Sequence, residues 1–363
     1  MPIALGIGIS LVFGGVSIST PAAPTNSVAP VISGAVYVGQ VLSSTTGTWS
    51  GSPSYAYQWK RGGSSIGGAT SSTYSVTVSD EGQNIMCDVT ATNAGGSTVA
   101  SSNTLRHFIP TDLGAALSAW FDASDSSTIT LNGSTVSEWR DKSSAVRHIS
   151  QASAANQPTY NATGFNSKPA VVFDGSSDYL FRTSSFMYTQ GSATILGAFS
   201  GPNGSLDRYY IAEGYTAITA PIYGMVDFLS STDYLGAFLR TNSNAPIFPS
   251  GNTTLISSVF VGTPVIAGIT DTSTELTGYR NGNSGSTLSY TRSGTVSLDR
   301  FTVGALLRAT PGTYAPLTAG DLVISTALSS TNRAKLEGYF AHKWGLTANL
   351  VAGHPYITTV PTP

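Results

Sequence analysis

The chain has 363 residues, of which 10% are charged and 40% are hydrophobic. Charged residues make up roughly 25% of an average globular protein, and a charge-poor chain rich in serine and threonine argues against helix bundles and coiled coils. The 17 basic and 19 acidic side chains are scattered and nearly cancel. No basic surface for phosphate groups is therefore expected, and nucleic acid is not an expected partner.

The first 23 residues carry no charged side chain, and bulky apolar residues alternate there with small ones. The bulky positions are Ile3, Leu5, Ile7, Ile9, Leu11 and Phe13. A period of two is typical of a strand, and the Gly14-Gly15 pair argues against a membrane-spanning helix. Because an exposed strand of this kind pairs readily, we expect residues 1–23 to be an assembly segment. It would pair with other copies, as a homotrimer, or join other proteins of a host particle. Two alternatives stay open, an atypical export signal and a first strand of the chain's own core.

Residues 24–106 contain short alternating stretches, spaced about ten residues apart with turn residues between them, as in a small β-sandwich. The apolar positions are Val36 and Val38, then Tyr55, Tyr57 and Trp59, then Tyr74, Val76 and Val78, and finally Ile85, Cys87, Val89 and Ala91. Residues 63–67 match the G-x-S-x-G pattern of a serine nucleophile around Ser65. That pattern needs a strand-to-helix turn, whereas a hairpin is expected here, so Ser65 is not a candidate nucleophile.

This segment resembles the immunoglobulin-like modules of bacterial and phage surface proteins and virions. The motifs G-T-W-S-G, Y-x-W-x-R and A-T-N-A-G-G occur in that order between residues 46 and 97. The resemblance implies that Trp59 and Cys87 pack together in the core of the module. Because Cys87 is the only cysteine of the chain, we expect no disulfide. Residues 107–111 are the expected linker to the next domain.

Residues 112–358 contain many short strands and one helix. The expected strands include residues 119–121, 136–139, 170–173, 194–198, 209–212, 255–261, 265–269, 301–304 and 322–325. Several are apolar on both faces, as in the run from Ala170 to Phe173, which suits a sheet that is covered on both sides. Near the end, Leu336, Phe340 and Trp344 recur at helical spacing. Ser329 or Ser330 is the expected N-cap and Gly345 the expected stop. Residues 359–363 are a tail.

Four blocks in this region resemble the concanavalin A-like, or laminin-G-like, jelly roll common in phage and environmental bacterial proteins. They are residues 119–125, 136–143, 168–180 and 336–356. The chain is therefore expected to be all-β: an N-terminal assembly strand, a small immunoglobulin-like β-sandwich, and a larger concanavalin A-like jelly-roll sandwich with one C-terminal helix. The jelly roll implies no single function, because it hosts lectins, glycosidases and structural modules.

No cofactor is expected, although loop carboxylates are candidate ligands for a calcium ion. The candidates are Asp122 with Asp125, Asp141, and Asp174 with Asp178. The alternative is that these side chains cap turns by bonding their own backbone. Exposed aromatic residues, among them Tyr209, Tyr210 and Tyr215, are candidates for stacking on a sugar ring.

No paired carboxylates for glycoside hydrolysis are evident in the sequence, so the chain is not expected to be an enzyme. A glycan hydrolase that assembles acids from distant strands stays open as an alternative. From the resemblance of both modules and the signal-less N-terminus, we expect a structural protein on a bacteriophage virion surface, displayed as a fibre, spike or decoration. The jelly roll would contact host-surface glycans, and no membrane span is expected. The rival is a secreted or cell-surface bacterial carbohydrate-binding protein.

Overall fold

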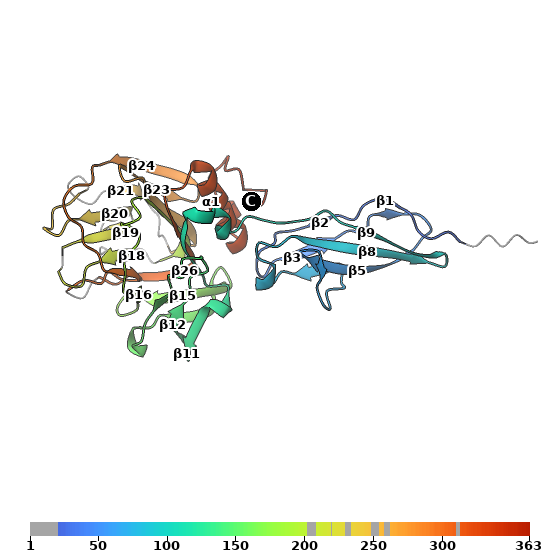
Figure 1. Cartoon of the computed structure of the whole chain (residues 1–363), viewed down its shortest axis with the longest axis horizontal. Helices are drawn as coiled ribbons and strands as arrows, with labels where there is room; N and C mark the ends of the chain where they lie inside the picture. The colour runs from blue at the N-terminus through green and yellow to red at the C-terminus, as the bar shows by residue number, and fades with distance from the viewer. Residues whose placement is uncertain are drawn as a thin grey trace, which may run out of the picture. The chain divides into compact units, whose positions relative to one another are not determined.

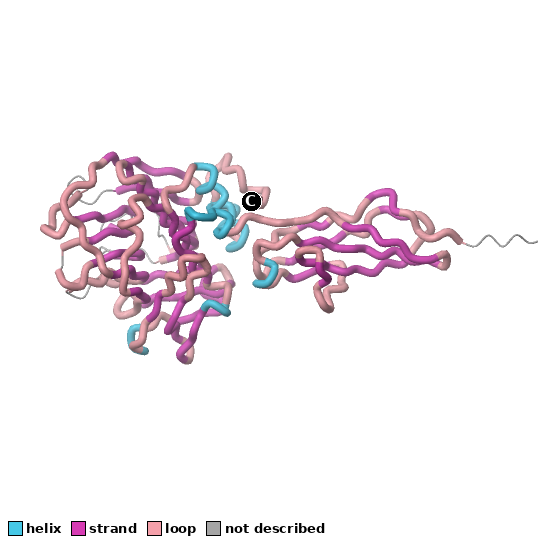
Figure 2. Tube along the Cα trace, viewed as in Figure 1, coloured by secondary structure: helices cyan, strands magenta, loops and turns pink. Residues whose placement is uncertain are grey.

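The computed structural model describes residues 21–201, 208–218, 220–228, 234–247, 254–257, 262–309 and 313–363. Strands dominate these residues, and their one α-helix is α1 (Ser330–Trp344), as Figures 1 and 2 show. The predicted all-β class with a C-terminal helix is confirmed. The predicted assembly positions from Ile3 to Phe13 lie outside the described residues.

The chain divides into two compact units, whose segments interleave in sequence. The smaller unit contains the residues up to Ser33 together with Ser43–Tyr74 and Ile85–Thr104. The larger unit contains Gly34–Leu42, Ser75–Asn84 and Leu105–Pro363. The linear boundaries expected from the sequence, 24–106 and 112–358, stay predictions.

The smaller unit is an immunoglobulin-like arrangement of short sheets. Its longest pairing joins β5 (Ser54–Arg61) to β8 (Ile85–Asn93), and Trp59 is the register partner of Cys87. Both side chains are fully buried and Cys87 is a free thiol, so the predicted pairing without a disulfide is confirmed. The remaining strands are β1 (Asn26–Val28), β2 (Ile32–Ser33), β3 (Val41–Ser44), β4 (Thr48–Trp49), β6 (Ser64–Ser65), β7 (Thr73–Ser75) and β9 (Gly96–Ser101). Ser65 lies in the β5–β6 hairpin, as expected.

The strand expected at Val36 and Val38 is not formed. These residues lie in a turn between β2 and β3. The backbone N–H of Val36 donates to the imidazole of His107, and Tyr37 is fully buried beside Tyr339. Val36 and Tyr37 thus anchor this turn within the larger unit, and the alternation of Val36 and Val38 does not mark a strand.

The strands of the larger unit pair into one closed sheet, which we describe as two parts, sheet A and sheet B. Sheet A is built around β26 (Pro316–Ser325), which pairs along one edge with β17 (Ala193–Ser200) and along the other with β10 (Leu117–Asp122) and β15 (Lys168–Asp174). It continues through β14 (Thr159–Phe165), β22 (Val265–Asp271), β23 (Glu275–Arg280) and β24 (Asn283–Ser289).

Sheet B is antiparallel throughout and is joined to sheet A through β12, which pairs with both β13 and β14. Its strands, in the order in which they pair, are β11 (Ile129–Asn132), β12 (Thr135–Trp139), β13 (Ile149–Ser150), β16 (Leu180–Arg182), β25 (Arg300–Val303), β18 (Arg208–Gly214), β19 (Ile222–Phe228), β20 (Tyr234–Arg240) and β21 (Thr254–Ser257).

The central strands of sheet A are buried on both faces. On β26, Leu322 and Ile324 point into the core between the two sheets, whereas Val323 points into a second core under α1. On β10, Phe121 likewise points into the core between the two sheets, and Trp120 points into the core under α1. Side chains alternate across a strand, so a strand that serves two cores must be apolar at nearly every position. This explains the continuous apolar runs of the sequence.

Helix α1 begins and ends where the sequence predicts. The Ser329 hydroxyl accepts a hydrogen bond from the backbone N–H of Asn332, and Gly345 adopts a left-handed conformation with a φ of 72°. Leu336, Phe340 and Trp344 are fully buried in the core over sheet A. The helix therefore covers that core.

A buried imidazole makes the larger unit sensitive to acid. His107 Nδ1 accepts the N–H of Val36 at 2.8 Å, which requires an unprotonated nitrogen. Burial, and then the nearby His342, lower the pKa of His107 from 6.5 to about 4. The neutral form is thus favoured in the folded state, so the stability that His107 contributes is full above pH 6.5 and is lost as the pH falls toward 4.

We predict that the titration of His107 lowers the free energy of unfolding of the chain by about 3 kcal/mol between pH 6.5 and pH 4. His107→Gln keeps an acceptor for Val36 but does not titrate, so its unfolding free energy should fall less over that range. Urea unfolding at several pH values measures both. Identical pH profiles for the two proteins would contradict the prediction.

Candidate functional site: a buried carboxylate–lysine cluster and an aromatic surface

Most of the carboxylates predicted as calcium ligands cap turns instead. Asp174 accepts the backbone N–H groups of Ser176, Ser177 and Asp178. Burial alone would raise the pKa of Asp174, but these hydrogen bonds lower it further than burial raises it. Asp178 in turn accepts the N–H of Asp174. The turn alternative is therefore confirmed for this pair.

Asp141 is also held by its own loop. It accepts backbone N–H groups from Trp120, Ser143 and Arg147 at 2.7–2.8 Å, and the Ser143 hydroxyl as well. A carboxylate with four donors has few lone pairs left for a cation. Asp141 therefore fixes the loop after β12 against β10.

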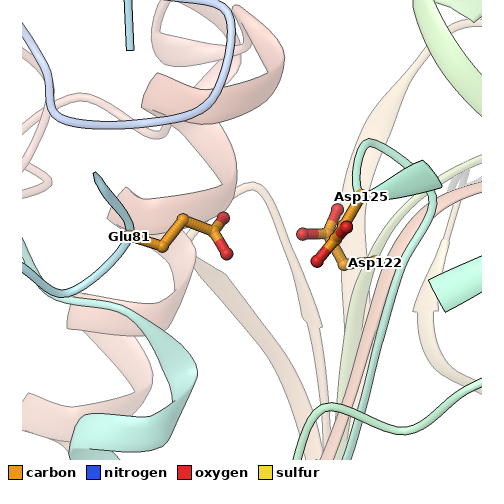
Figure 3. A group of neighbouring side chains, drawn as sticks. All are labelled: Glu81, Asp122 and Asp125. Atoms are coloured by element: carbon orange, nitrogen blue, oxygen red, sulfur yellow. The ribbon is translucent and has the colours of Figure 1, made fainter. Parts of the chain in front are cut away.

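Asp122 and Asp125 meet a third carboxylate, Glu81. Figure 3 shows the carboxylate of Glu81 directed toward those of Asp122 and Asp125, and ligand oxygens of the three lie within 4.8 Å of one another. The ammonium of Lys142 is shared among them, with its Nζ 2.5 Å from Glu81, 2.8 Å from Asp125 and 3.1 Å from Asp122. The place that a calcium ion would take is thus filled by a lysine of the chain itself.

The electrostatics agree with an ion-pair network. Burial lowers the pKa of Lys142, but Asp122 and Glu81 raise it by more, so the ammonium is retained. Burial raises the pKa of Glu81 and outweighs the lowering by Lys343 and Lys142. Asp122 is fully buried, which would raise its pKa, yet Lys343 and Lys142 hold it well below the usual range. As a free side chain, Asp122 is therefore negatively charged at neutral pH.

A second lysine and a fourth carboxylate lie deeper, under α1. Lys343 Nζ is 2.7 Å from Asp122 Oδ1 and 3.0 Å from Asp321 Oδ2. Its side chain is 1% exposed and the two aspartates are 0% exposed. Asp321 also accepts the indole N–H groups of Trp120 and Trp344 and the hydroxyl of Tyr339. Every oxygen of Asp321 thus has a partner.

The fold brings these groups together from distant parts of the chain. Asp122 ends β10 and is the register partner of Asp321 on β26. Lys343 lies in the last turn of α1, where the helix dipole favours a cation. Sequence reasoning named Asp122 but missed Asp321, Lys142 and Lys343. The signal was available, because Asp321 interrupts a strand that is otherwise apolar on both faces, and a charge buried there must have a partner.

We predict that calcium does not change the thermal unfolding midpoint of the native chain, because the ammonium of Lys142 already occupies the position between the three carboxylates. Lys142→Ala removes the cation that pairs with Glu81 and Asp125, which should cost about 3–5 kcal/mol. It should also make the unfolding midpoint higher in calcium than in chelator. Thermal unfolding with calcium or EDTA measures both effects. Lys60→Ala removes the half-exposed pair with Asp88 and is the control, with an expected loss of about 1 kcal/mol or less. A calcium response of the native chain equal to that of Lys142→Ala would contradict the assignment.

The aromatic residues proposed for sugar stacking lie elsewhere than expected. Tyr210 is fully buried between the sheets and Tyr209 is 7% exposed, whereas Tyr215 is half-buried. The expectation for Tyr209 and Tyr210 is therefore wrong. Their strand, β18, is paired on both edges within sheet B. The side chains of Tyr209 and Tyr210 point to opposite faces of that strand, and both faces are buried there.

A different aromatic group is accessible on the outer side of sheet B. We call Tyr179, Phe181, Tyr314 and Arg300 the aromatic surface; all four are half-buried. The Tyr179 ring lies 5.8 Å from that of Phe181 and 6.2 Å from that of Tyr314, between centroids. The Arg300 guanidinium lies 4.9 Å from the centroid of Phe181 and forms no ion pair with a described residue. Leu180 points into the core, so its neighbour Phe181 must point outward.

Comparison with known proteins finds similarity in structure only. No protein-family model matches the chain, and no curated protein sequence matches it. A Trypanosoma rangeli sialidase in complex with 2,3-difluorosialic acid is 12% identical, with a TM-score of 0.41, over 76% of this chain and 44% of the sialidase. A structure of botulinum neurotoxin type C, whose cell entry depends on interaction with two ganglioside molecules, is 12% identical, with a TM-score of 0.44, over 63% of this chain and 52% of that one. The chain thus spans about half of these proteins or less, and the similarity concerns the β fold alone.

The expectation that the chain is not an enzyme is corrected here. Five of the structures that it resembles are sialidases, which are enzymes, and the expectation is withdrawn. The reasoning behind it relied on the spacing of acids along the sequence. Folding places Asp122 beside Asp321 although their strands are about 200 residues apart in the sequence, so isolation in sequence says little about separation in space.

In the part of the chain that the structure describes, no helix is long and apolar enough to cross a membrane.

Proposed function

We propose that the chain is a structural protein displayed on a bacteriophage particle, as a fibre, spike or decoration, and that its jelly roll adheres to host-surface glycans through the aromatic surface. The observation that carries the glycan part is the aromatic surface itself. Three half-buried rings offer apolar faces to solvent beside a guanidinium that has no carboxylate partner among the described residues.

The chemistry of this surface suits a sugar. A pyranose ring has an apolar face that packs on an aromatic ring, and polar edges that need hydrogen-bond partners. Arg300 supplies donors next to Phe181, and a guanidinium binds carboxylate or phosphate groups in a two-pronged geometry. The surface therefore favours an acidic glycan over a neutral one.

The display part of the proposal has a different basis. Two motif-based resemblances, to immunoglobulin-like modules of surface and virion proteins and to a jelly roll common in phage proteins, support it. The charge-poor, Ser/Thr-rich composition suits a particle exposed to varied salt, because exposed ion pairs contribute little there.

We predict that Tyr179→Ala lowers the affinity of the chain for its glycan about three- to tenfold, because one stacked ring contributes roughly 0.5–1.5 kcal/mol. Arg300→Gln should lower binding to acidic glycans and leave neutral ones unaffected. A printed array of bacterial surface polysaccharides measures both. Tyr55→Ala removes a 41% exposed tyrosine of the smaller unit and should bind like the native chain. Loss of binding in Tyr55→Ala equal to that in Tyr179→Ala would contradict the site, and no binding to any bacterial polysaccharide would contradict glycan adhesion.

The proposed assembly segment gives a second prediction. If residues 1–23 join copies of the chain, the full-length protein should be a trimer in solution and a chain that begins at Pro24 should be a monomer. Light scattering coupled to size-exclusion chromatography measures both masses. Equal masses would contradict the assembly role of residues 1–23 and leave glycan binding untouched.

A secreted or cell-surface carbohydrate-binding protein is the second candidate, and the aromatic surface supports it equally. The location of the native protein separates the two. Peptides of the chain in purified phage particles, with residues 1–23 intact, would support the virion role. A mature N-terminus near Ala22 or Ala23 in a bacterial culture medium would support the rival and overturn the virion role.

A further inference from the structure

We propose that Lys343 and Asp122 condense into an intramolecular isopeptide bond, which covalently links the last turn of α1 to the end of β10. The product would be an amide between Lys343 Nζ and Asp122 Cγ, with the release of one water. The inference does not depend on the proposed function.

The reacting groups are already in contact. Lys343 Nζ lies 2.7 Å from Asp122 Oδ1, which is contact distance between a nucleophile and the carboxyl group that it would attack. Both side chains belong to packed elements, and they lie against the buried rings of Trp120, Tyr339 and Trp344. Groups held at contact in a rigid site react as if at very high concentration. The fold thus supplies the positioning that this bond needs.

The surroundings favour the amide over the ions. Lys343, Asp122 and Asp321 are 0–1% exposed, and charges buried in this way carry a large desolvation penalty. Condensation replaces one ammonium and one carboxylate by a neutral amide, and it expels water from a site that has almost no contact with solvent. Both changes drive the equilibrium toward the bond.

Asp321 is placed to carry protons. Its Oδ2 lies 3.0 Å from Lys343 Nζ. Burial is the main cause that raises the pKa of Asp321, to about 7, so it can both accept and release a proton at neutral pH. Burial lowers the pKa of Lys343, but Asp122 and Asp321 raise it by more. The resting state is therefore the ion pair, and transfer of a proton to Asp321 precedes attack.

The atoms and charges balance. The Lys343 nitrogen loses two protons and forms a bond to Asp122 Cγ, while the bond from Cγ to Oδ2 breaks and that oxygen leaves with two protons as water. The N–H and hydroxyl of Ser124 both donate to Oδ1 and would stabilise the oxyanion of the tetrahedral intermediate. Lys142, 3.1 Å from Oδ2, is placed to donate a proton to that oxygen before the attack, so that the attacked group is a carboxylic acid. The second proton of the released water passes to Oδ2 from the attacking nitrogen. One proton passed from Asp321 to Lys142 then restores both groups.

Intact mass spectrometry of the purified, denatured full-length chain tests the proposal. The native chain should be lighter than its sequence by one water, and Lys343→Arg should have its full sequence mass. Asp122→Asn gives a distinct mass change, because an asparagine that condenses with Lys343 releases ammonia instead of water. If this variant forms the bond, it should be lighter than its sequence by one ammonia. Asp321→Asn, which removes the proton carrier, should condense more slowly or not at all.

Peptide mapping locates the bond and excludes the other source of a lost water. A succinimide at Asp174-Gly175 would give the same mass loss, but it joins no two peptides and opens in mild base. Trypsin should fail to cleave after Lys343, and the peptide that contains Lys343 should be recovered joined to the one that contains Asp122. Recovery of both peptides separately from the native chain would overturn the proposal, whether or not the variants fold.

Discussion

The larger unit depends on the buried position of Lys343, whose Nζ lies between Asp122 and Asp321. Sheet A has a second core on its outer face, and α1 must cover it. A helix that only packs on a sheet can slide or rotate, because apolar contacts have little directional preference. The placement of Lys343 defines both the position and the rotation of α1, since its nitrogen must reach two specific carboxylates. The two tryptophan N–H groups and the hydroxyl of Tyr339 then require the neighbouring side chains to take one arrangement.

The same principle explains why so few charges are found in such a large domain. Where the sequence places an acid inside an apolar strand, the fold supplies a cation or a set of backbone donors. Glu213 is fully buried and accepts the N–H groups of Phe186, Met187 and Tyr188. Asp271 is fully buried and pairs with Arg292. Buried ions of this kind specify one arrangement of the sheets more than they add stability.

The sequence predicts the parts of this structure that depend on local rules. Helix α1 follows from Ser329, the four-residue steps and Gly345, and the pairing of Trp59 with Cys87 follows from a motif. The turn at Val36 and Val38 could not be predicted, because Val36 and Tyr37 there contact His107 and Tyr339 from remote segments. Nor could the role of Lys142, since the sequence shows the acids of a cation site but does not show that a lysine of the next loop fills it. The aromatic surface gathers residues from β16, β25 and the approach to β26, and only the register of sheet B makes them neighbours.

The position of β26 at the centre of sheet A has a consequence for the order of events during synthesis. Strand β10 emerges early from the ribosome, yet its partner is the last strand of the chain, and β17 pairs with that same strand. Neither can complete its ladder until nearly the whole chain has been made. Long-range pairing of this kind slows folding and leaves unpaired strand edges exposed in the meantime. The jelly roll is therefore expected to fold after translation ends, in a cellular setting where chaperones have time to act on its open edges.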